Sequence, residues 1–408
     1  MNRKRILFIV LDGLGDRPIS ALNGLTPLES ARTPNLNMLA ENAQCGLLDP
    51  LGVGVRPGSD VAVMNLLGYQ PSKYYCGRGS LEAMGLHMNL KQGDVCLRVD
   101  FATVDSQMKV TDRRAGRIGD VSVFEKELNK IKVGGASAEF KAGVGHRGAL
   151  VFRGSGLSTK ISDTDPQVVG KKPNEVKPTD NTVEAKNTSN IVAEYLKKAN
   201  AMLKKHPENK KRVKQKLLAA NCILVRGAGI PPIWPDFKEK TGLSAACVAA
   251  GALEKGIARA AGMDVISVSG ATGKSDTDLV AKAVAAKKAL TTHEFVFLHI
   301  KATDNFGHDG DYAGKRNFIE RIDSAFREFV SMHNVLVVVT GDHSTPCEMG
   351  AHSGDPLPIM FSGDNSRKDA VKKFGERECT KGIEGRISGV NLLDEMLNLA
   401  GWAAIRGS

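Results

Sequence analysis

Short apolar runs recur along the chain, and each is followed by a loop that contains glycine or polar residues. The first run, Arg5–Leu11, is rich in Ile, Leu and Val, which is typical of a strand buried on both faces of a sheet. Further runs of this kind lie at Asp264–Val268, Glu294–Ile300 and Val335–Thr340. Helical patterns lie between them, at Ala245–Ala261, Asp276–Leu290 and Asn317–Met332. Because strands alternate with helices of this length, the pattern predicts an α/β fold with a mostly parallel sheet flanked by helices.

The middle of the chain is more polar and less regular than the rest. Between about Asn89 and Pro232 the pattern predicts strand-like pieces at Val95–Val104, Ala149–Phe152 and Ile223–Val225, followed by a proline-rich linker. The α/β pattern resumes after this linker. We therefore expect a core domain made of residues 1–88 and 232–408, interrupted by a smaller inserted α+β domain at 89–231.

The chain carries a formal net charge of +11, and a balance of this sign favours anionic partners. Much of the charge lies in one stretch, Lys197–Lys216, which contains Pro207. We interpret this stretch as a solvated helical face around a proline break, because no nucleic-acid-binding motif accompanies it. The charge therefore favours an anionic small molecule as the partner, and nucleic acid is not expected.

The seven cysteines are scattered and show no Cys-x-x-Cys spacing. An odd, dispersed set predicts reduced thiols and a cytoplasmic location, and it argues against a disulfide framework. No apolar run reaches the roughly 18–20 residues that a membrane-spanning helix needs, so no membrane partner is expected. The apolar stripes leave the oligomeric state open, a homo-oligomer included.

Carboxylate and imidazole side chains follow three of the predicted strands. Asp12 follows the first strand, and Asp304 with His308 follows Glu294–Ile300. Three more such residues, Asp342, His343 and His352, come after Val335–Thr340. The carboxyl ends of strands in an open α/β sheet meet at one edge, so these side chains are expected to lie close together. Mixed sets of Asp and His are typical ligands of divalent cations, and this set is large enough for about two.

Ser59 is the candidate nucleophile. It follows Pro57 and Gly58 and precedes a helical pattern, which puts it at a helix N-terminus where backbone N–H groups favour an incoming anion. A cation bound to its oxygen would lower the pKa of the hydroxyl and activate it. A serine at this position is equally compatible with a simple helix N-cap.

Several longer motifs occur in one order along nearly the whole chain. They include L-D-G-L-G-D-R-P, R-P-G-S-D-V-A, G-R-G-S-L-E-A-M-G, D-R-R-A-G-R, G-H-R-G, I-S-D-T-D-P, H-I-K-A-T-D-N-F-G-H-D-G and D-H-S-T-P-C. The set resembles the archaeal-type cofactor-independent phosphoglycerate mutases, a family of the alkaline phosphatase superfamily. The resemblance implies an alkaline-phosphatase-like core with an inserted domain that closes over the substrate. It implies an isomerase of glycolysis and gluconeogenesis that interconverts 3-phosphoglycerate and 2-phosphoglycerate without 2,3-bisphosphoglycerate.

The resemblance also implies roles for individual residues. Ser59 would carry the phosphoryl group as a phosphoserine intermediate. One cation would be held by Asp12, Ser59, Asp342 and His343, and a second by Asp304, His308 and His352. The cations would be manganese, with zinc, cobalt or magnesium as alternatives, and no organic cofactor is implied.

Substrate contacts are predicted from basic residues, because arginine binds phosphate and carboxylate groups in a bidentate manner. The candidates are Arg113, Arg117, His146, Arg147, Arg226 and Lys301. Asp163 is the candidate general acid and base for the hydroxyl proton. An alternative function keeps the same metal site but makes the protein a phosphatase, or a mutase for another phosphate ester or phosphonate. The large insertion with its arginines favours the phosphoglycerate reaction.

Overall fold

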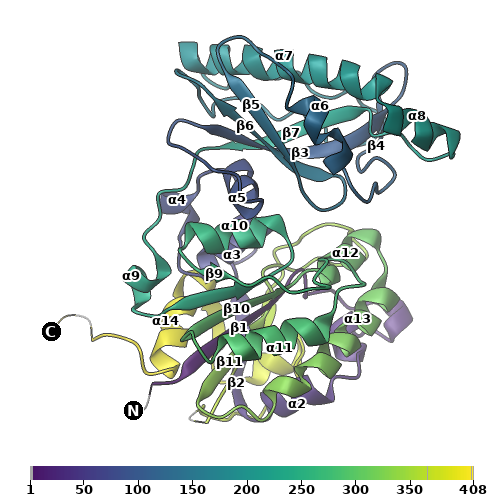
Figure 1. Cartoon of the computed structure of the whole chain (residues 1–408). Helices are drawn as coiled ribbons and strands as arrows, with labels where there is room; N and C mark the ends of the chain where they lie inside the picture. The colour runs from purple at the N-terminus through teal and green to yellow at the C-terminus, as the bar shows by residue number, and fades with distance from the viewer. Residues whose placement is uncertain (1–2, 365, 406, 408) are drawn as a thin grey trace. The chain divides into compact units, whose positions relative to one another are not determined.

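The computed structural model describes residues 3–364, 366–405 and 407, and the chain divides into two compact units. The first unit, called the core unit here, takes in Met1–Tyr75, Trp234–Glu254 and Ala261–Ser408. The second unit takes in Cys76–Ile233 and Lys255–Ala260. The helix α10 (Ala252–Ala260) begins in the core unit and ends in the second. Each unit has its own sheet, as Figure 1 shows.

The sheet of the core unit is an eight-stranded sheet in the order β13-β2-β12-β11-β1-β10-β8-β9. Its strands are β1 (Arg5–Leu11), β2 (Ala43–Asp49), β8 (Ala245–Val248), β9 (Asp264–Val265), β10 (Phe295–Ile300), β11 (Val335–Thr340), β12 (Leu357–Ser362) and β13 (Gly385–Ser388). The central strand β1 is parallel to both of its neighbours, with Ile9 opposite Leu298 of β10 and Val339 of β11. Only β12 runs antiparallel to its neighbours. The mostly parallel sheet is therefore as predicted.

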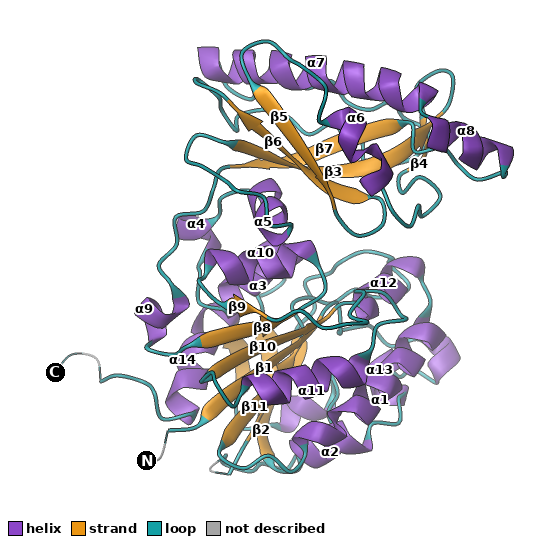
Figure 2. Ribbon diagram, in the orientation of Figure 1, coloured by secondary structure: helices purple, strands orange, loops and turns teal. Residues whose placement is uncertain are grey.

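Helices flank this sheet (Figure 2). Helices α2, α11 and α13 contact one another or the strands beside them, and α14 contacts β11, β13 and α3. The helices of the core unit are α1 (Pro27–Ser30), α2 (Pro34–Ala40), α3 (Ser59–Leu66), α4 (Pro71–Tyr74), α9 (Phe237–Thr241), α11 (Leu279–Ala289), α12 (Ala302–Asp309), α13 (Tyr312–Phe326) and α14 (Gly389–Leu399), with short 3₁₀ turns η1 (Ser20–Leu22), η3 (Arg327–Phe329) and η4 (Glu378–Lys381). All six residues of β10 and of β11 are buried, as expected for strands covered on both faces.

The second unit is built on an antiparallel sheet around the strand β3. Its strands are β3 (Val95–Val104), β4 (Val110–Asp112), β5 (Ser137–Ala142), β6 (Arg147–Arg153) and β7 (Cys222–Gly229). Strand β3 pairs with β6, β7 and β4, and β6 pairs with β5. The helices are α5 (Arg78–Gly85), α6 (Glu125–Leu128), α7 (Val183–Lys205) and α8 (Pro207–Lys214), with the 3₁₀ turn η2 (Ser122–Phe124).

Alternate residues of β3 face two hydrophobic clusters on opposite sides of this sheet. Leu97, Val99 and Phe101 join the larger cluster, which includes apolar residues of α7. Cys96 points to the other side, into the cluster that contains Ala83 of α5. The sheet is therefore covered by α7 on one face and by α5 on the other.

Helix α5 belongs to the second unit, although the predicted boundary at Asn89 left it in the core. It packs closely on β3, because the position of a Cβ on Gly79 would lie 2.4 Å from the carbonyl oxygen of Cys96. The second unit accordingly begins at Cys76. Turn residues and helix periodicity mark where an element lies, but they do not show against which sheet it packs.

Three other element predictions differ from the structure. The segment Ala245–Ala261 was expected to be a single helix, but Ala245–Val248 forms strand β8 beside β10 and only the later part is helical. The strand predicted at Asp264–Val268 is reduced to β9, and β2, β12 and β13 were not predicted. Short alanine-rich or mixed runs are ambiguous between helix and strand, and here pairing within the sheet decides the outcome.

The basic stretch Lys197–Lys216 forms the end of α7 and all of α8, and Pro207 is the first residue of α8. Its lysines are exposed, whereas Arg212 is buried and donates to the carbonyl oxygens of Leu218 and Ala115. The stretch is therefore the solvated helical face that the sequence predicts. In the part of the chain that the structure describes, no helix is long and apolar enough to cross a membrane.

Candidate metal centre

The carboxyl ends of β1, β10 and β11 carry the acidic and imidazole side chains of the core unit. Asp12 directly follows β1, and its backbone N–H donates to the carbonyl oxygen of Ile300 at the end of β10, at 2.9 Å. Asp304 and His308 lie on α12, one helical turn apart, just after β10. Asp342 and His343 follow β11, and His352 lies in the loop beyond. The parallel pairing of these strands brings the three loops to one edge of the sheet.

Asp12, Asp342 and His343 form the first group, called group A here. Their ligand atoms lie within 4.8 Å of one another, and all three side chains are fully buried. The His343 Nε2 atom is 3.3 Å from Asp12 Oδ1 and 3.5 Å from Asp342 Oδ2. Asp12 Oδ1 and Asp342 Oδ2 have no hydrogen-bond partner in the described structure. Buried carboxylate oxygens without a partner are costly, and a bound cation would satisfy them.

The side chain of Ser59 lies beside group A. It is the first residue of α3, and Gly58 occupies the N-cap, so Ser59 does not serve as the N-cap. Its hydroxyl oxygen lies 3.1 Å from His343 Nε2, and the residue is 4% exposed. The hydroxyl is thus aimed at the group of candidate ligands, and the helix begins without its help.

Asp304, His308 and His352 form the second group, called group B here. The Nε2 atoms of His308 and His352 are 3.2 Å apart and lie 3.3 and 3.5 Å from Asp304 Oδ1. Each histidine is oriented through its other nitrogen, because His308 Nδ1 lies 2.9 Å from the carbonyl oxygen of Gly350 and His352 Nδ1 lies 2.7 Å from that of Pro57. A carbonyl oxygen only accepts, so both Nδ1 atoms carry the proton and both Nε2 lone pairs converge beside Asp304. Convergent acceptors of this kind fit a cation.

Charges around Asp12 and Asp304 hold both carboxyl groups ionised. Burial alone would raise the pKa of Asp12, but the Lys301 ammonium together with the imidazoles of His299 and His343 brings this pKa well below its ordinary value. Burial and the negative charge of Asp12 would also raise the pKa of Asp304, yet Lys301 and the nearby histidines lower it. Lys301 Nζ lies 2.6 Å from Asp12 Oδ2 and 3.5 Å from Asp304 Oδ2. Lys301 therefore contacts one acidic residue of each group.

The pKa values of the other two members of group A, Asp342 and His343, are raised. Burial and the charge of Asp12 raise the pKa of Asp342. Burial would lower the pKa of His343, but Asp342 and Asp12 raise it to about 9. The imidazole thus compensates for the carboxylates of group A when no cation does so. A cation in the group would take over this role and displace the proton from Nε2.

A third cluster shares Asp12 with group A and contains Glu254 and His299. His299 Nε2 lies 3.3 Å from Asp12 Oδ2 and 3.9 Å from Glu254 Oε1, and both residues are 1% exposed. Neither ring nitrogen of His299 has a hydrogen-bond partner in the described structure, and the same holds for Glu254 Oε2. This cluster therefore adjoins group A through Asp12 as a third set of candidate ligands.

Four arginines gather around two acidic residues in the second unit, and we call this set the arginine cluster. It consists of Arg78, Arg98, Arg147 and Arg226 with Glu82 and Asp100. Arg98 binds both oxygens of Asp100 at 3.1 and 3.0 Å, and Arg226 Nε donates to the same carboxylate at 3.2 Å. Burial and the neighbouring Arg98 lower the pKa of Arg147, whose buried Nε has no hydrogen-bond partner in the described structure. The cluster carries an excess of positive charge, which an anion would neutralise.

The other predicted substrate residues lie in different surroundings. His146 lies 3.5 Å from Asp100, and burial lowers its pKa to about 4 in spite of that carboxylate, so it is neutral near pH 7. Arg113 forms a bidentate ion pair with the buried Asp165 at 3.1 and 2.6 Å. Arg117 is exposed, and Asp163 is exposed with one oxygen accepting from Gly227 N at 2.9 Å. Thus His146, Arg147 and Arg226 come together through Asp100, whereas Lys301 lies between the two groups of candidate ligands and Arg113 is paired with Asp165.

The sequence does not identify several residues of the arginine cluster and of the candidate metal centre. Arg78 and Glu82 stand four apart on α5, and Arg98 and Asp100 stand two apart on β3, which puts each pair on one face of its element. That spacing was a usable signal. In the core unit, His299 and Thr345 lie inside quoted motifs, but only the contacts of their side chains show that they adjoin the candidate ligands.

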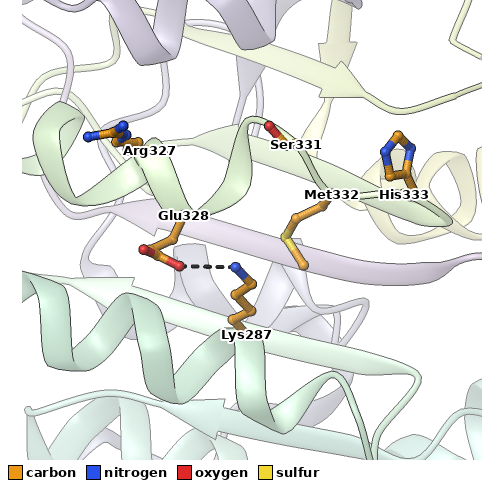
Figure 3. A pocket seen from close by; sticks show the side chains of 6 residues that line it. All are labelled: Lys287, Arg327, Glu328, Ser331, Met332 and His333. Carbon is orange, nitrogen blue, oxygen red and sulfur yellow. Dashed lines mark hydrogen bonds and ion pairs between the residues drawn. The ribbon is translucent and has the colours of Figure 1, made fainter.

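A surface hollow of the core unit lies apart from the two groups (Figure 3). It is lined by Lys287, Arg327, Glu328, Ser331, Met332 and His333. Lys287 and Glu328 form an ion pair across it at 3.0 Å. These residues precede β10 and β11, whereas the candidate ligands follow the same strands. The hollow therefore lies at the amino ends of the strands and has no part in the metal centre.

Comparisons with known proteins show which family this chain resembles. A sequence model of the 2,3-bisphosphoglycerate-independent phosphoglycerate mutases matches residues 40–209. A protein of that name from Archaeoglobus fulgidus is 46% identical over 97% of this chain and 98% of its own length. A further one from Methanocaldococcus jannaschii is 43% identical over 98% of both chains.

Two solved structures are also similar over the whole length. A Pyrococcus horikoshii protein is 37% identical, covers 100% of both chains and has a TM-score of 0.84. The cofactor-independent phosphoglycerate mutase of Thermoplasma acidophilum is 37% identical, with a TM-score of 0.66, and the match covers 98% of this chain and 100% of that one. With this identity across the full length, the chain belongs to the family of 2,3-bisphosphoglycerate-independent phosphoglycerate mutases.

Proposed function

We propose that this protein interconverts 3-phosphoglycerate and 2-phosphoglycerate through a phosphoserine at Ser59, without 2,3-bisphosphoglycerate. The observation that carries the proposal is the position of the Ser59 hydroxyl, 3.1 Å from His343 Nε2 and beside the buried carboxylates of group A. A serine at a helix N-terminus also has backbone N–H groups directed toward an incoming phosphoryl group. Family membership supports the same reaction.

Two divalent cations would be held by the two groups described above. Asp12, Asp342, His343 and the Ser59 oxygen would bind one, and Asp304, His308 and His352 the other. Bound there, the cations would supply Lewis acidity to the phosphoryl oxygens and lower the pKa of the serine hydroxyl. We propose manganese as the physiological ion, because mixed oxygen and nitrogen ligands suit it, with zinc, cobalt and magnesium as the alternatives.

The chain's own residues would carry the transfer in two steps. The Ser59 hydroxyl gives up its proton and its oxygen attacks phosphorus while the bond from phosphorus to the glycerate oxygen breaks, and that glycerate oxygen takes up a proton. In the second step the other hydroxyl of the glycerate loses its proton and attacks the phosphoserine, while the bond from phosphorus to the Ser59 oxygen breaks and that oxygen takes up a proton. We propose Asp163 as the group that accepts and returns this proton, since its carboxylate is oriented by Gly227 N. Lys301, placed beside Asp12 and Asp304, would balance the charge of the phosphoryl group.

The arginine cluster of the second unit is proposed to bind an anionic group of the substrate. Arg147 is the best candidate, because it is surrounded by other cations and its Nε has no partner among the described residues. Arg226 and His146 adjoin it through Asp100. Arg113 and Arg117 are weaker candidates, since Arg113 is already paired with Asp165 and Arg117 is exposed.

The Arg147→Met variant separates this role from a structural one. Loss of one charge-assisted hydrogen bond costs about 1.5–3 kcal/mol, so KM for 3-phosphoglycerate should rise about 10- to 150-fold. The matched control is Arg153→Met on the same strand, because Arg153 is occupied by Asp94 and Glu139. Steady-state kinetics of both variants measure KM for 3-phosphoglycerate, which should be unchanged in Arg153→Met. Equal KM values in the wild type and Arg147→Met would remove Arg147 from the substrate site.

A coupled assay tests the proposed reaction itself. The protein is given 3-phosphoglycerate without 2,3-bisphosphoglycerate, and formation of 2-phosphoglycerate is followed through enolase. Turnover is expected, with loss on treatment with EDTA and recovery on addition of Mn²⁺. Release of free phosphate without 2-phosphoglycerate would instead identify a metal-dependent phosphatase, the alternative that the same metal centre allows.

A further inference from the structure

Thr345 is the one described side chain whose hydroxyl contacts a candidate ligand from each of the two groups. It is fully buried, and its Oγ1 lies 3.0 Å from Asp304 Oδ1 of group B and 3.0 Å from His343 Nδ1 of group A. These contacts are side chain to side chain, so the conformation of one threonine fixes a distance between the two groups.

The chemistry of the hydroxyl determines the direction of both hydrogen bonds. An ionised carboxylate only accepts, so the single hydroxyl proton of Thr345 is donated to Asp304. The lone pair of Thr345 then accepts the proton on His343 Nδ1. This leaves His343 Nε2, which lies 3.1 Å from Ser59 Oγ, as the nitrogen that can bind a cation.

The surroundings hold Thr345 in place from several sides. Its backbone N–H donates to Gly15 O at 3.0 Å, and its carbonyl oxygen accepts from Lys315 Nζ at 3.1 Å. Lys315 is also fully buried and donates to Gly15 O and to Asp16 Oδ2 at 3.0 and 2.9 Å. The loop after β1 and the loop after β11 are thus tied together behind the candidate ligands.

Two glycines lie so close to Thr345 that a side chain on either would collide with it. A Cβ on Gly13, which has a φ of +65°, would lie 2.7 Å from Thr345 Oγ1. A Cβ on Gly307 would lie 2.4 Å from the Thr345 carbonyl oxygen. Any larger residue at either position would therefore clash with Thr345, so both glycines are needed for the backbone to approach it this closely.

We propose that Thr345 is a positioning residue that couples the two cation sites: its hydroxyl selects the His343 tautomer for one site and orients Asp304 for the other. The inference rests on the proposed function in that it assigns cations to groups A and B. It goes further, because Thr345 belongs to neither set of candidate ligands. Loss of the hydroxyl is then expected to weaken both sites, although the threonine itself is a ligand of neither.

Metal binding by three variants tests the proposal, measured by calorimetric titration of Mn²⁺ into the metal-free full-length protein. Thr345→Val keeps the shape of the side chain but removes the hydroxyl, and it should weaken both binding events about 10- to 100-fold, the usual scale for lost partners of metal ligands. Thr345→Ser keeps the hydroxyl and should bind within about threefold of the wild type on the same scale. Thr345→Cys, with a weaker hydrogen-bonding group, should fall between them, and it supplies the comparison if Thr345→Val does not fold.

Several results would overturn the coupling role. These are wild-type affinity in Thr345→Val, weakening at only one of the two sites, or a Thr345→Ser variant as weak as Thr345→Val. The titration contains no substrate, so its outcome is separate from that of the mutase assay. A wild type that binds Mn²⁺ at two sites but lacks mutase activity contradicts the proposed function alone, while an active wild type with unaffected Mn²⁺ binding in Thr345→Val contradicts the coupling alone.

Discussion

The Ser59→Ala variant should lose mutase activity while keeping the fold. Removal of the atom that accepts the phosphoryl group eliminates the covalent route, and loss of a nucleophile typically lowers kcat by a factor on the order of 10⁶. The fold should survive because Gly58, not Ser59, is the N-cap of α3, and the Ser59 hydroxyl contacts His343 rather than the helix backbone. The coupled assay measures the loss, and thermal unfolding measures the stability.

Ser362→Ala is the matched control for this variant. Ser362 is buried to a similar extent in the same unit, on β12, and donates to the carbonyl oxygen of Leu39 at 3.0 Å. It should lose about 1 kcal/mol of unfolding free energy and keep its activity. If Ser59→Ala retained more than a small fraction of wild-type kcat, the covalent mechanism would be wrong.

Removal of one ligand from either group should remove one cation and most of the activity. Asp342→Ala should empty the site of group A, because Asp342 is fully buried and one of its oxygens has no other partner in the described structure. His308→Ala should empty the site of group B, since the two Nε2 atoms there converge on Asp304. Elemental analysis of the dialysed proteins should show half the metal content of the wild type in each variant.

Asp323→Asn serves as the control for these two substitutions. Asp323 is also buried, but it caps a different part of the core unit by accepting from Leu36 N at 2.7 Å. Its loss should lower the stability and leave the metal content unchanged. Full metal content in Asp342→Ala or in His308→Ala would mean that the affected residue is not a ligand.

The fold was predictable where the hydrophobic pattern is strong. Arg5–Leu11 and Val335–Thr340 form the predicted strands with the same bounds, because continuous runs of Ile, Leu and Val suit a strand buried on both faces. The family was confirmed as well. The alanine-rich start of Ala245–Ala261 was misread as helix, since its strand character comes from pairing with β10 rather than from local preference.

The clustering of the candidate ligands was predictable because they follow strand ends. Parallel strands bring their carboxyl ends to one edge, so Asp12, Asp304 and Asp342 had to meet if the sheet formed. The roles of Thr345 and Lys315 could not be predicted, because each depends on the distance between atoms of separate loops. The arginine cluster was predictable only in part. The spacing of Arg98 and Asp100 places both on one face of β3, but the strand pairing that puts Arg147 and Arg226 beside them cannot be read from spacing.

The phosphoserine is the central claim, and one measurement tests it directly. Protein mixed with 3-phosphoglycerate and Mn²⁺ is quenched within one turnover, digested and analysed by mass spectrometry. The account predicts that the peptide with Ser59 gains the mass of one phosphoryl group, and that Ser59→Ala gains none. Phosphorylation of another residue, or formation of 2-phosphoglycerate with no phosphorylated peptide at any quench time, would contradict it.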